Sequence, residues 1–119
     1  MDKPRILICD DEEGIRESLK LILKDDYELA FCTNGQECLD CIIGDKDYDL
    51  LLLDIKMPKV NGLEILKQVK AKKPDLKIIV VTGYKSVETA QEALKAGASD
   101  YVVKPFESKE LKRAIQKII

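Results

Sequence analysis

Five polar side chains at the ends of apolar runs are the residues of this sequence that could do chemistry. They are Asp10, Asp11, Asp54, Thr82 and Lys104. Carboxylates gathered at one place repel one another, so such a group is tolerable only with a neutralising cation. Oxygen ligands in a chain without histidine favour Mg²⁺, which keeps part of its water and takes phosphate oxygens as further ligands. The set indicates magnesium-dependent phosphoryl chemistry on Asp54, with a charge from Lys104 and a hydrogen bond from Thr82.

Taken singly, these residues have ordinary structural explanations. Asp10 and Asp11 could cap a helix, and Asp54 could form the turn before a proline loop. Thr82 and Lys104 could be a strand-end hydroxyl and a solvated ammonium. The hypothesis therefore depends on the fold bringing these strand ends together.

The helices and strands expected to carry these side chains alternate along the chain. Apolar runs predict strands at 5–9, 27–32, 50–54, 77–83 and 100–103. Apolar residues at helical spacing predict helices at about 12–24, 35–43, 61–73, 86–97 and 108–118. The four leucines before Asp54 are typical of a strand buried on both faces, as in a parallel sheet.

Five strands alternating with five helices over short loops predict right-handed crossovers. The expected fold class is α/β, a flavodoxin-like, doubly wound (βα)5 domain with a parallel five-stranded sheet in the order 2-1-3-4-5. The carboxyl ends of its strands would share one edge, with a ligand crevice between the first and third strands. That edge would carry all five polar side chains.

Several polar residues are expected to begin helices. Asn61, Ser86 and Ser108 stand before apolar periodic runs, where a side-chain oxygen can accept from free amides. The helix that follows Ser86 shows Val87 and Leu94 on one apolar face, together with Ala90.

Length and composition limit the class of protein. With 119 residues, 45% hydrophobic and 35% charged, the chain fits one globular domain over 1–119. No apolar run approaches the length of a membrane helix, so we expect a cytoplasmic protein with no membrane partner. Residues 1–60 carry 8 basic and 15 acidic side chains, whereas residues 61–119 carry 12 and 7. This asymmetry argues against general nucleic-acid binding and suits a site that holds a cation beside an anion.

The cysteines leave two interpretations. Cys38 and Cys41 stand in a Cys-x-x-Cys pattern, which can indicate a redox pair or half of a zinc site. Cys9 and Cys32 fall inside apolar strand patterns, and the chain has no histidine or second pair to complete a tetrahedral zinc site. We favour small buried hydrophobes in a reducing cytosol.

The motifs together resemble the receiver domain of bacterial two-component response regulators, most closely the nitrogen-regulation type. The resemblance covers essentially the whole chain. It rests on Cys9-Asp10-Asp11-Glu12, Leu52-Leu53-Asp54-Ile55-Lys56-Met57-Pro58, Asn61-Gly62-Leu63-Glu64, Val80-Val81-Thr82-Gly83, Gly97-Ala98, Asp100-Tyr101 and Lys104-Pro105-Phe106.

The resemblance implies that Asp54 accepts a phosphoryl group from a sensor histidine kinase or a histidine phosphotransfer protein. It also implies Mg²⁺ as the cofactor, with Mn²⁺ as a substitute. Asp11, Asp54 and the main-chain carbonyl of Lys56 would contact the ion directly, and Asp10 would act through water. Such a protein is a phosphorylated signalling switch rather than an enzyme, although it assists its own phosphorylation and dephosphorylation.

The family's switch residues also have counterparts here. Lys104 would pair with the phosphoryl group, Thr82 would hydrogen-bond it and shift toward it, and Tyr101 would move from an outward to an inward rotamer. A cis peptide bond would join Lys104 to Pro105. The face formed by the fourth helix, fifth strand and fifth helix would change. Dimerisation through that face is left open.

The end of the chain predicts a longer protein. Apolar Ile118 and Ile119 end the chain, so we expect a receiver excised from a longer regulator that would contact DNA only through an output domain.

Three other functions are alternatives to a phosphorylated receiver. The first, a haloacid-dehalogenase-type phosphatase, needs an acid two residues after its nucleophile, where this chain has Lys56. The second, a dinucleotide-binding module, needs a phosphate-cradling loop where the acidic run follows the first strand. A receiver fold without phosphorylation is the third.

Overall fold

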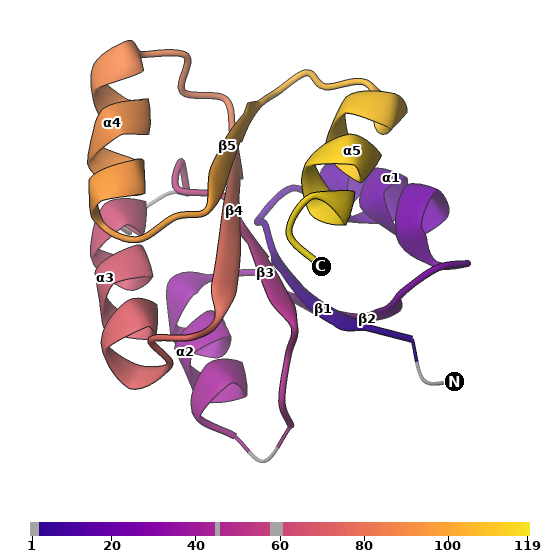
Figure 1. Ribbon diagram of the computed structural model, residues 1–119, viewed down its shortest axis with the longest axis horizontal. Helices are drawn as coiled ribbons and strands as arrows, with labels where there is room; N and C mark the ends of the chain where they lie inside the picture. Colours follow the sequence, from indigo (N-terminus) through magenta and orange to yellow (C-terminus); the bar gives the residue numbers. More distant parts are fainter. Residues whose placement is uncertain (1–2, 45, 58–60) are drawn as a thin grey trace.

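A computed structural model describes residues 3–44, 46–57 and 61–119 of the chain (Figure 1). Five parallel strands form one sheet in the order β2-β1-β3-β4-β5, so the predicted fold class and strand order are confirmed. In chain order the elements are β1 (Arg5–Cys9), α1 (Glu13–Leu23), β2 (Glu28–Cys32), α2 (Gly35–Ile43), β3 (Leu50–Leu53), α3 (Gly62–Lys72), β4 (Lys77–Thr82), α4 (Val87–Lys95), β5 (Asp100–Val103) and α5 (Ser108–Gln116).

The helices cover both faces of the sheet. Figure 1 shows α2, α3 and α4 on one side of the strands and α1 and α5 on the other. Each side has its own apolar cluster of buried side chains. Among the described residues no helix has the length and apolar character needed to cross a membrane.

The leucine run of β3 lies at the centre of the sheet. All four leucines are buried. Leu51 and Leu53 join the cluster under α2, α3 and α4, whereas Leu50 and Leu52 join the cluster under α1 and α5. Successive side chains of a strand point to opposite faces, so an unbroken leucine run packs on both layers at once. The strand that leads to Asp54 is therefore held from both sides.

Helix starts follow the sequence prediction in two of three cases. The Asn61 side chain accepts from the amides of α3, and the Ser86 hydroxyl accepts from the amide of Thr89. The predicted cap at Ser108 is wrong. Ser108 is already the first residue of α5, and the extended backbone before the helix belongs to Glu107, whose side chain makes no capping hydrogen bond. A cap needs a non-helical backbone, and that conformation falls one residue earlier than the pattern indicated.

The large apolar side chains of α4 lie on the surface of the molecule. Val87 and Leu94 are 72% and 48% exposed, and Ala93 is the buried residue of this helix. The face noted in the sequence is therefore a surface feature of α4, and a small residue makes its close contact with the core. In contrast, Leu111 and Ile115 of α5 are buried.

The cysteines occupy the elements expected for them. Cys9 and Cys32 end β1 and β2, and Cys38 and Cys41 lie on α2. The first three of these side chains are buried, Cys41 is half-buried, and all four are free thiols. The favoured interpretation, small buried hydrophobes, agrees with the burial of three of the four.

Candidate functional site

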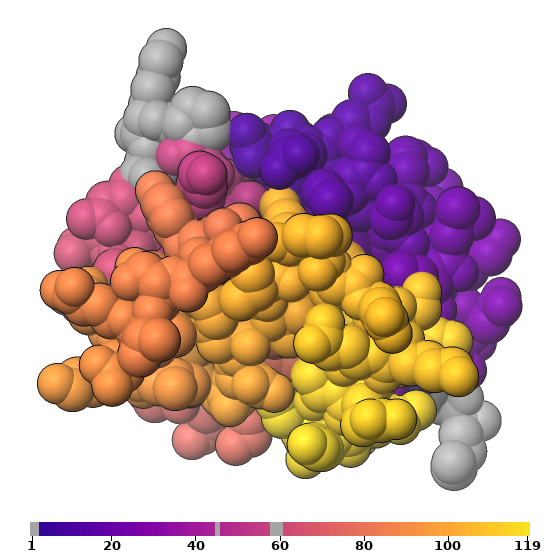
Figure 2. Space-filling model, turned by 90° about the horizontal axis from the view of Figure 1, so that it is seen from above, coloured from indigo at the N-terminus to yellow at the C-terminus, as the bar shows by residue number. Residues whose placement is uncertain are grey.

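Main-chain hydrogen bonds continue the sheet just beyond its strands and so place the polar side chains. The amide of Asp10 donates to Cys32 O, and the amide of Asp54 donates to Cys9 O. The amide of Lys104 donates to the carbonyl of Thr82 in the same way. Segments from early, middle and late parts of the chain consequently lie side by side on the face seen in Figure 2. The strand ends converge, as the topology predicted.

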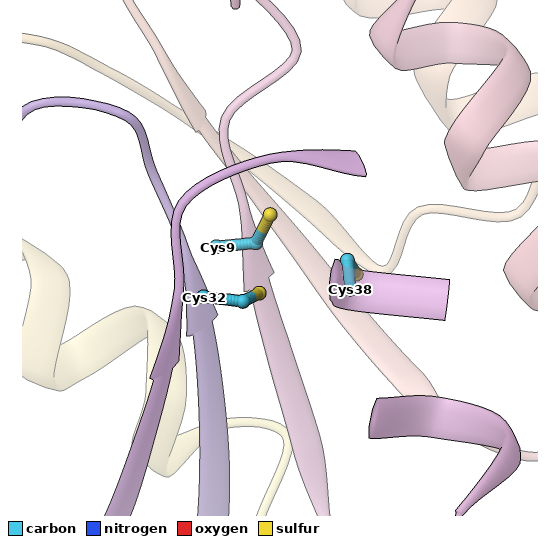
Figure 3. A group of neighbouring side chains, drawn as sticks. All are labelled: Cys9, Cys32 and Cys38. Atoms are coloured by element: carbon cyan, nitrogen blue, oxygen red, sulfur yellow. The ribbon is translucent and has the colours of Figure 1, made fainter. Parts of the chain in front are cut away.

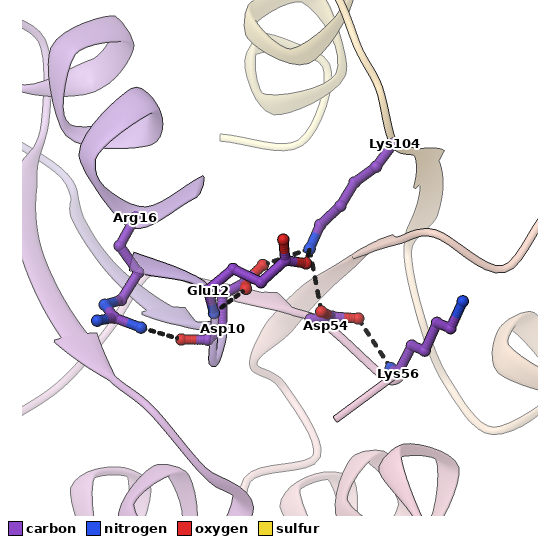
Figure 4. A network of polar contacts seen from close by, with 6 residues as sticks. All are labelled: Asp10, Glu12, Arg16, Asp54, Lys56 and Lys104. Atoms are coloured by element: carbon purple, nitrogen blue, oxygen red, sulfur yellow. Dashed lines mark hydrogen bonds and ion pairs between the residues drawn. The ribbon is translucent and has the colours of Figure 1, made fainter. Parts of the chain in front are cut away.

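The ammonium group of Lys104 lies among the carboxylates (Figure 4). Its Nζ is 2.8 Å from Asp10 Oδ2, 3.0 Å from Asp54 Oδ2 and 3.2 Å from Glu12 Oε1. Asp10 and Asp54 are each only 2% exposed, so these are charges held almost entirely out of water. The peptide bond between Lys104 and Pro105 is cis. The site joins residues from opposite ends of the sequence around one cation.

Burial and charge pull the pKa values of this group in opposite directions. Burial raises the pKa of Asp10 above its usual range, although the hydrogen bond from Lys104 acts against that shift. Burial alone would lower the pKa of Lys104, but hydrogen bonds to Asp10 and Asp54 outweigh it and raise the pKa well above its usual range. Lys104 is thus held firmly as a cation, while Asp10 is ionised less readily than an exposed aspartate.

Carboxylate oxygens of Asp10, Asp11, Glu12 and Asp54 lie within 4.8 Å of one another. We call these four residues the acidic cluster. Asp10 and Asp54 are buried, whereas Asp11 and Glu12 are exposed at the mouth of the site. Among the described residues, Lys104 is the side chain that forms ion pairs with these carboxylates, so they outnumber it. An all-oxygen donor set with excess negative charge fits Mg²⁺.

Glu12 and Arg16 are members of the site that the sequence prediction omitted. Glu12 pairs with Lys104, and its amide donates to Asp10 Oδ1 at 2.9 Å. Arg16 Nη1 donates to the carbonyl oxygen of Asp10 at 2.8 Å, which fixes the turn into α1. Glu12 directly follows the two aspartates, so the acidic run was a usable signal. Arg16 carried none, because its contact depends on how the first turn of α1 is oriented.

The segment after β3 holds the Asp54 side chain in place. The amide of Lys56 donates to Asp54 Oδ1 at 2.8 Å. Gly62, the first residue of α3, packs so tightly on the backbone of Ile55 that an added Cβ would collide with it. This close approach requires glycine. Pro58 of the predicted motif lies outside the described residues. The metal-binding role of the Lys56 carbonyl stays a prediction.

Thr82 and Tyr101 lie near the site with contrasting hydrogen bonding. The Thr82 hydroxyl is completely buried and has no hydrogen-bond partner among the described residues. A buried hydroxyl left unpaired costs about 1–3 kcal/mol, so it is a group that an incoming acceptor would satisfy. The Tyr101 hydroxyl donates to the carbonyl of Tyr84 at 2.8 Å, and its ring is half-buried. The Lys56 ammonium lies 5.3 Å from the centre of the Tyr84 ring.

Comparison with known proteins identifies the class. Residues 6–116 match the family model described as the response regulator receiver domain. The chain belongs to this family. That membership confirms the resemblance drawn from the motifs and decides against the phosphatase and dinucleotide-binding alternatives.

The chain is similar in sequence to a regulatory protein and to a response regulator. The chain is 38% identical over 116 residues to regulatory protein AtoC of Escherichia coli, covering 97% of this chain and 25% of AtoC. It is 42% identical over 108 residues to response regulator MprA of Mycobacterium tuberculosis, covering 90% of this chain and 46% of MprA. The chain thus spans less than half the length of these relatives.

A solved structure with similar sequence has the same fold. It is the response regulator protein TrrA from Thermotoga maritima in complex with Mg(2+)-BeF. It is 42% identical, has a TM-score of 0.86, and the match covers 98% of this chain and 99% of that one. The protein is therefore a receiver domain in both sequence and architecture.

Proposed function

We propose that Asp54 is the phosphoacceptor of this receiver and takes its phosphoryl group from a phosphohistidine. The donor would be a sensor histidine kinase or a histidine phosphotransfer protein. The observation that carries the proposal is the position of Asp54, buried at the end of β3 with the Lys104 ammonium 3.0 Å away. A carboxylate oxygen attacks phosphorus, the bond to the donor's imidazole nitrogen breaks, and its electron pair leaves with the imidazole.

The residues around Asp54 would divide the work of this transfer. The Lys56 amide holds one carboxylate oxygen, which orients the other toward the incoming phosphorus. Lys104 offers a positive charge to the phosphoryl oxygens as they gain charge. The Thr82 hydroxyl, which has no hydrogen-bond partner among the described residues, would donate to one of those oxygens. Each role uses a donor already near the place where negative charge develops.

Mg²⁺ would be held by Asp11, Asp54 and the main-chain carbonyl of Lys56, with Asp10 contacting it through water; Mn²⁺ would substitute. The excess of carboxylates over cations in the acidic cluster supports this assignment. TrrA, a receiver of 42% identity, was solved in complex with Mg(2+)-BeF. The ion would neutralise phosphoryl oxygens that the acidic cluster would otherwise repel.

The output of this switch would lie on the face formed by α4, β5 and α5. Thr82 would shift toward the phosphoryl group, and Tyr101 would then exchange an outward for an inward rotamer. The hydrogen bond from Tyr101 to Tyr84 supports a link between β5 and the segment before α4. Exposed Val87 and Leu94 make this face suited to a partner or a second copy of the chain. We propose that the chain works within a longer, cytoplasmic regulator that controls transcription.

Phosphorylation of the isolated chain tests the proposal. We expect the wild type, with Mg²⁺ and a small phosphodonor, to gain about 80 Da, the mass of one phosphoryl group, in an acid-stable and base-labile form. Asp54→Asn removes the nucleophile and should abolish the gain, as measured by intact-protein mass spectrometry. Asp49→Asn is the matched control at the opposite end of β3, where this carboxylate accepts from the Arg5 amide. An unchanged gain in Asp54→Asn, or none in the wild type at any donor concentration, would refute the assignment.

A further inference from the structure

A second group of ligand-type side chains, Cys9, Cys32 and Cys38, lies where α2 meets the ends of β1 and β2 (Figure 3). Cys9 and Cys32 are paired in register at the carboxyl ends of β1 and β2, and Cys38 lies one turn into α2. The three sulfur atoms all lie within 4.8 Å of one another. We call these three residues the cysteine cluster. Three separate elements, β1, β2 and α2, thus each contribute one ligand-type side chain to it.

The surroundings of the cysteine cluster are apolar. The three side chains are at most 3% exposed and belong to the cluster of buried side chains under α2, α3 and α4. The Cys9 thiol donates to the carbonyl of Asn34 at 3.4 Å, so one sulfur is oriented by the turn that begins α2. No disulfide joins any pair. The cluster therefore offers three soft donors in a medium that strongly disfavours net charge.

We propose that the cysteine cluster binds a trivalent thiophilic metalloid, As(III) or Sb(III), through all three sulfurs. Charge selects the ion, because three thiolates around a monovalent or divalent cation would leave a net negative charge buried among apolar side chains. A trivalent centre gives a neutral complex. Zinc would also require a fourth ligand to complete its tetrahedron, and Cys41 lies outside the group of close sulfurs.

The geometry suits a three-coordinate centre. Bonds of about 2.3 Å, the usual length of a metal–thiolate bond, put three sulfurs about 3.5–4 Å apart. The observed separations of up to 4.8 Å need only a modest contraction, which small side-chain rotations can supply. Cys38 begins the second turn of α2, so a movement of this helix away from β2 would admit the ligand.

The binding step balances without any oxidant or reductant. Arsenous acid brings three hydroxyl groups on As(III), and each arsenic–oxygen bond is replaced by an arsenic–sulfur bond. Each thiol proton leaves with a hydroxide as water, so three waters are released and arsenic keeps its oxidation state. The product is a neutral tris-thiolate. The proposal is independent of phosphorylation at Asp54.

Arsenite binding to the reduced 119-residue chain tests the proposal. Native mass spectrometry should show a gain of one arsenic atom with the loss of three hydrogens, and X-ray absorption should show three arsenic–sulfur contacts and no oxygen neighbour. Alanine in place of Cys9, Cys32 or Cys38 should weaken binding by about 100-fold or more, because one of three linked bonds is lost. Cys41→Ala is the matched control on the same helix and should bind like the wild type.

Several results would overturn the proposal. They are a two-sulfur arsenic centre, weakened binding in Cys41→Ala, wild-type affinity in any of the three cluster variants, or no binding at all. Displacement of arsenic by equimolar Zn²⁺ or Cu⁺ would overturn the choice of a trivalent centre. Circular dichroism shows whether each variant folds. The absorption spectrum of the wild type decides the coordination even where a variant does not.

Discussion

The acidic cluster and the cysteine cluster begin at consecutive residues, Cys9 and Asp10, yet they lie in opposite environments. Cys9 is the last residue of β1, and its side chain enters the apolar layer beneath α2. Asp10 lies just beyond the strand, where its carboxylate meets the ammonium of Lys104 at the edge of the sheet. One step along the chain therefore separates a donor set enclosed by apolar side chains from a charged one that opens to solvent through Asp11.

The charge that the surroundings can hold decides which ligand each of the two donor sets suits. In the acidic cluster, exposed Asp11 and Glu12 and the nearby Lys104 keep several ions tolerable, so a hydrated divalent cation fits. The cysteine cluster lies among apolar side chains, so a ligand that gives a neutral complex fits it best. The two clusters should therefore respond differently to the loss of a residue.

The largest effect is expected from the cation of the acidic cluster. Lys104→Met leaves Asp10 and Asp54 buried without their partner, so the free energy of unfolding without Mg²⁺ should fall by about 3–5 kcal/mol. The deficit should shrink at lower pH, because burial already raises the pKa of Asp10 and protonation removes the unpaired charge. Urea unfolding at several pH values measures both trends.

Lys109→Met is the control for that variant, since it removes an exposed lysine from α5. It should change the free energy of unfolding by no more than about 0.5 kcal/mol. A loss below about 1 kcal/mol in Lys104→Met would mean that water compensates the carboxylates, and the two clusters would then differ less than we infer.

An intermediate effect is expected from Mg²⁺. Mg²⁺ added at about 100 times its dissociation constant for the wild type should raise the free energy of unfolding by about 2.7 kcal/mol. A chelator should reverse this increase. The gain should persist in Cys38→Ala and decrease in Asp54→Asn, which loses a proposed ligand. Unfolding midpoints measured at matched ionic strength separate binding from screening. Equal gains in both variants would contradict the proposed ligand set.

The smallest effect is expected from the cysteine cluster without a ligand. Cys38→Ala removes one buried sulfur from an apolar site, so the free energy of unfolding should fall by about 1 kcal/mol. Cys41→Ala on the same helix, where the side chain is half-buried, should cost less. Denaturant titration of both variants measures the difference. If the free energy of unfolding fell further in Cys41→Ala than in Cys38→Ala, the cysteine cluster would not stabilise the protein through its packing.

Much of the fold and of the acidic site was predictable because both depend on periodic patterns. The four leucines before Asp54 required a strand buried on both faces, and the strand-end positions of Thr82 and Lys104 followed from the parallel order. The cap expected at Ser108 was wrong because a helix boundary depends on backbone angles at a single residue.

The cysteine cluster could not be predicted in the same way. Spacing in the sequence drew attention to Cys38 and Cys41, which lie on one helix. The actual partners of Cys38 are Cys9 and Cys32, on strands that α2 happens to cover. No local pattern indicates which helix residue will face which pair of neighbouring strand residues, because that depends on the angle at which the layers pack.

Hydrophobic periodicity and right-handed crossovers leave few alternatives, so the amino-acid sequence was enough to predict the alternating elements, the strand order and the chemical types at the carboxyl edge. The contacts within that edge depended on the tertiary structure. It placed Lys104 between Asp10 and Asp54, left the Thr82 hydroxyl without a partner among the described residues, and brought three sulfurs together. Such contacts depend on distances of a few ångströms between segments far apart in the chain, which periodicity does not encode.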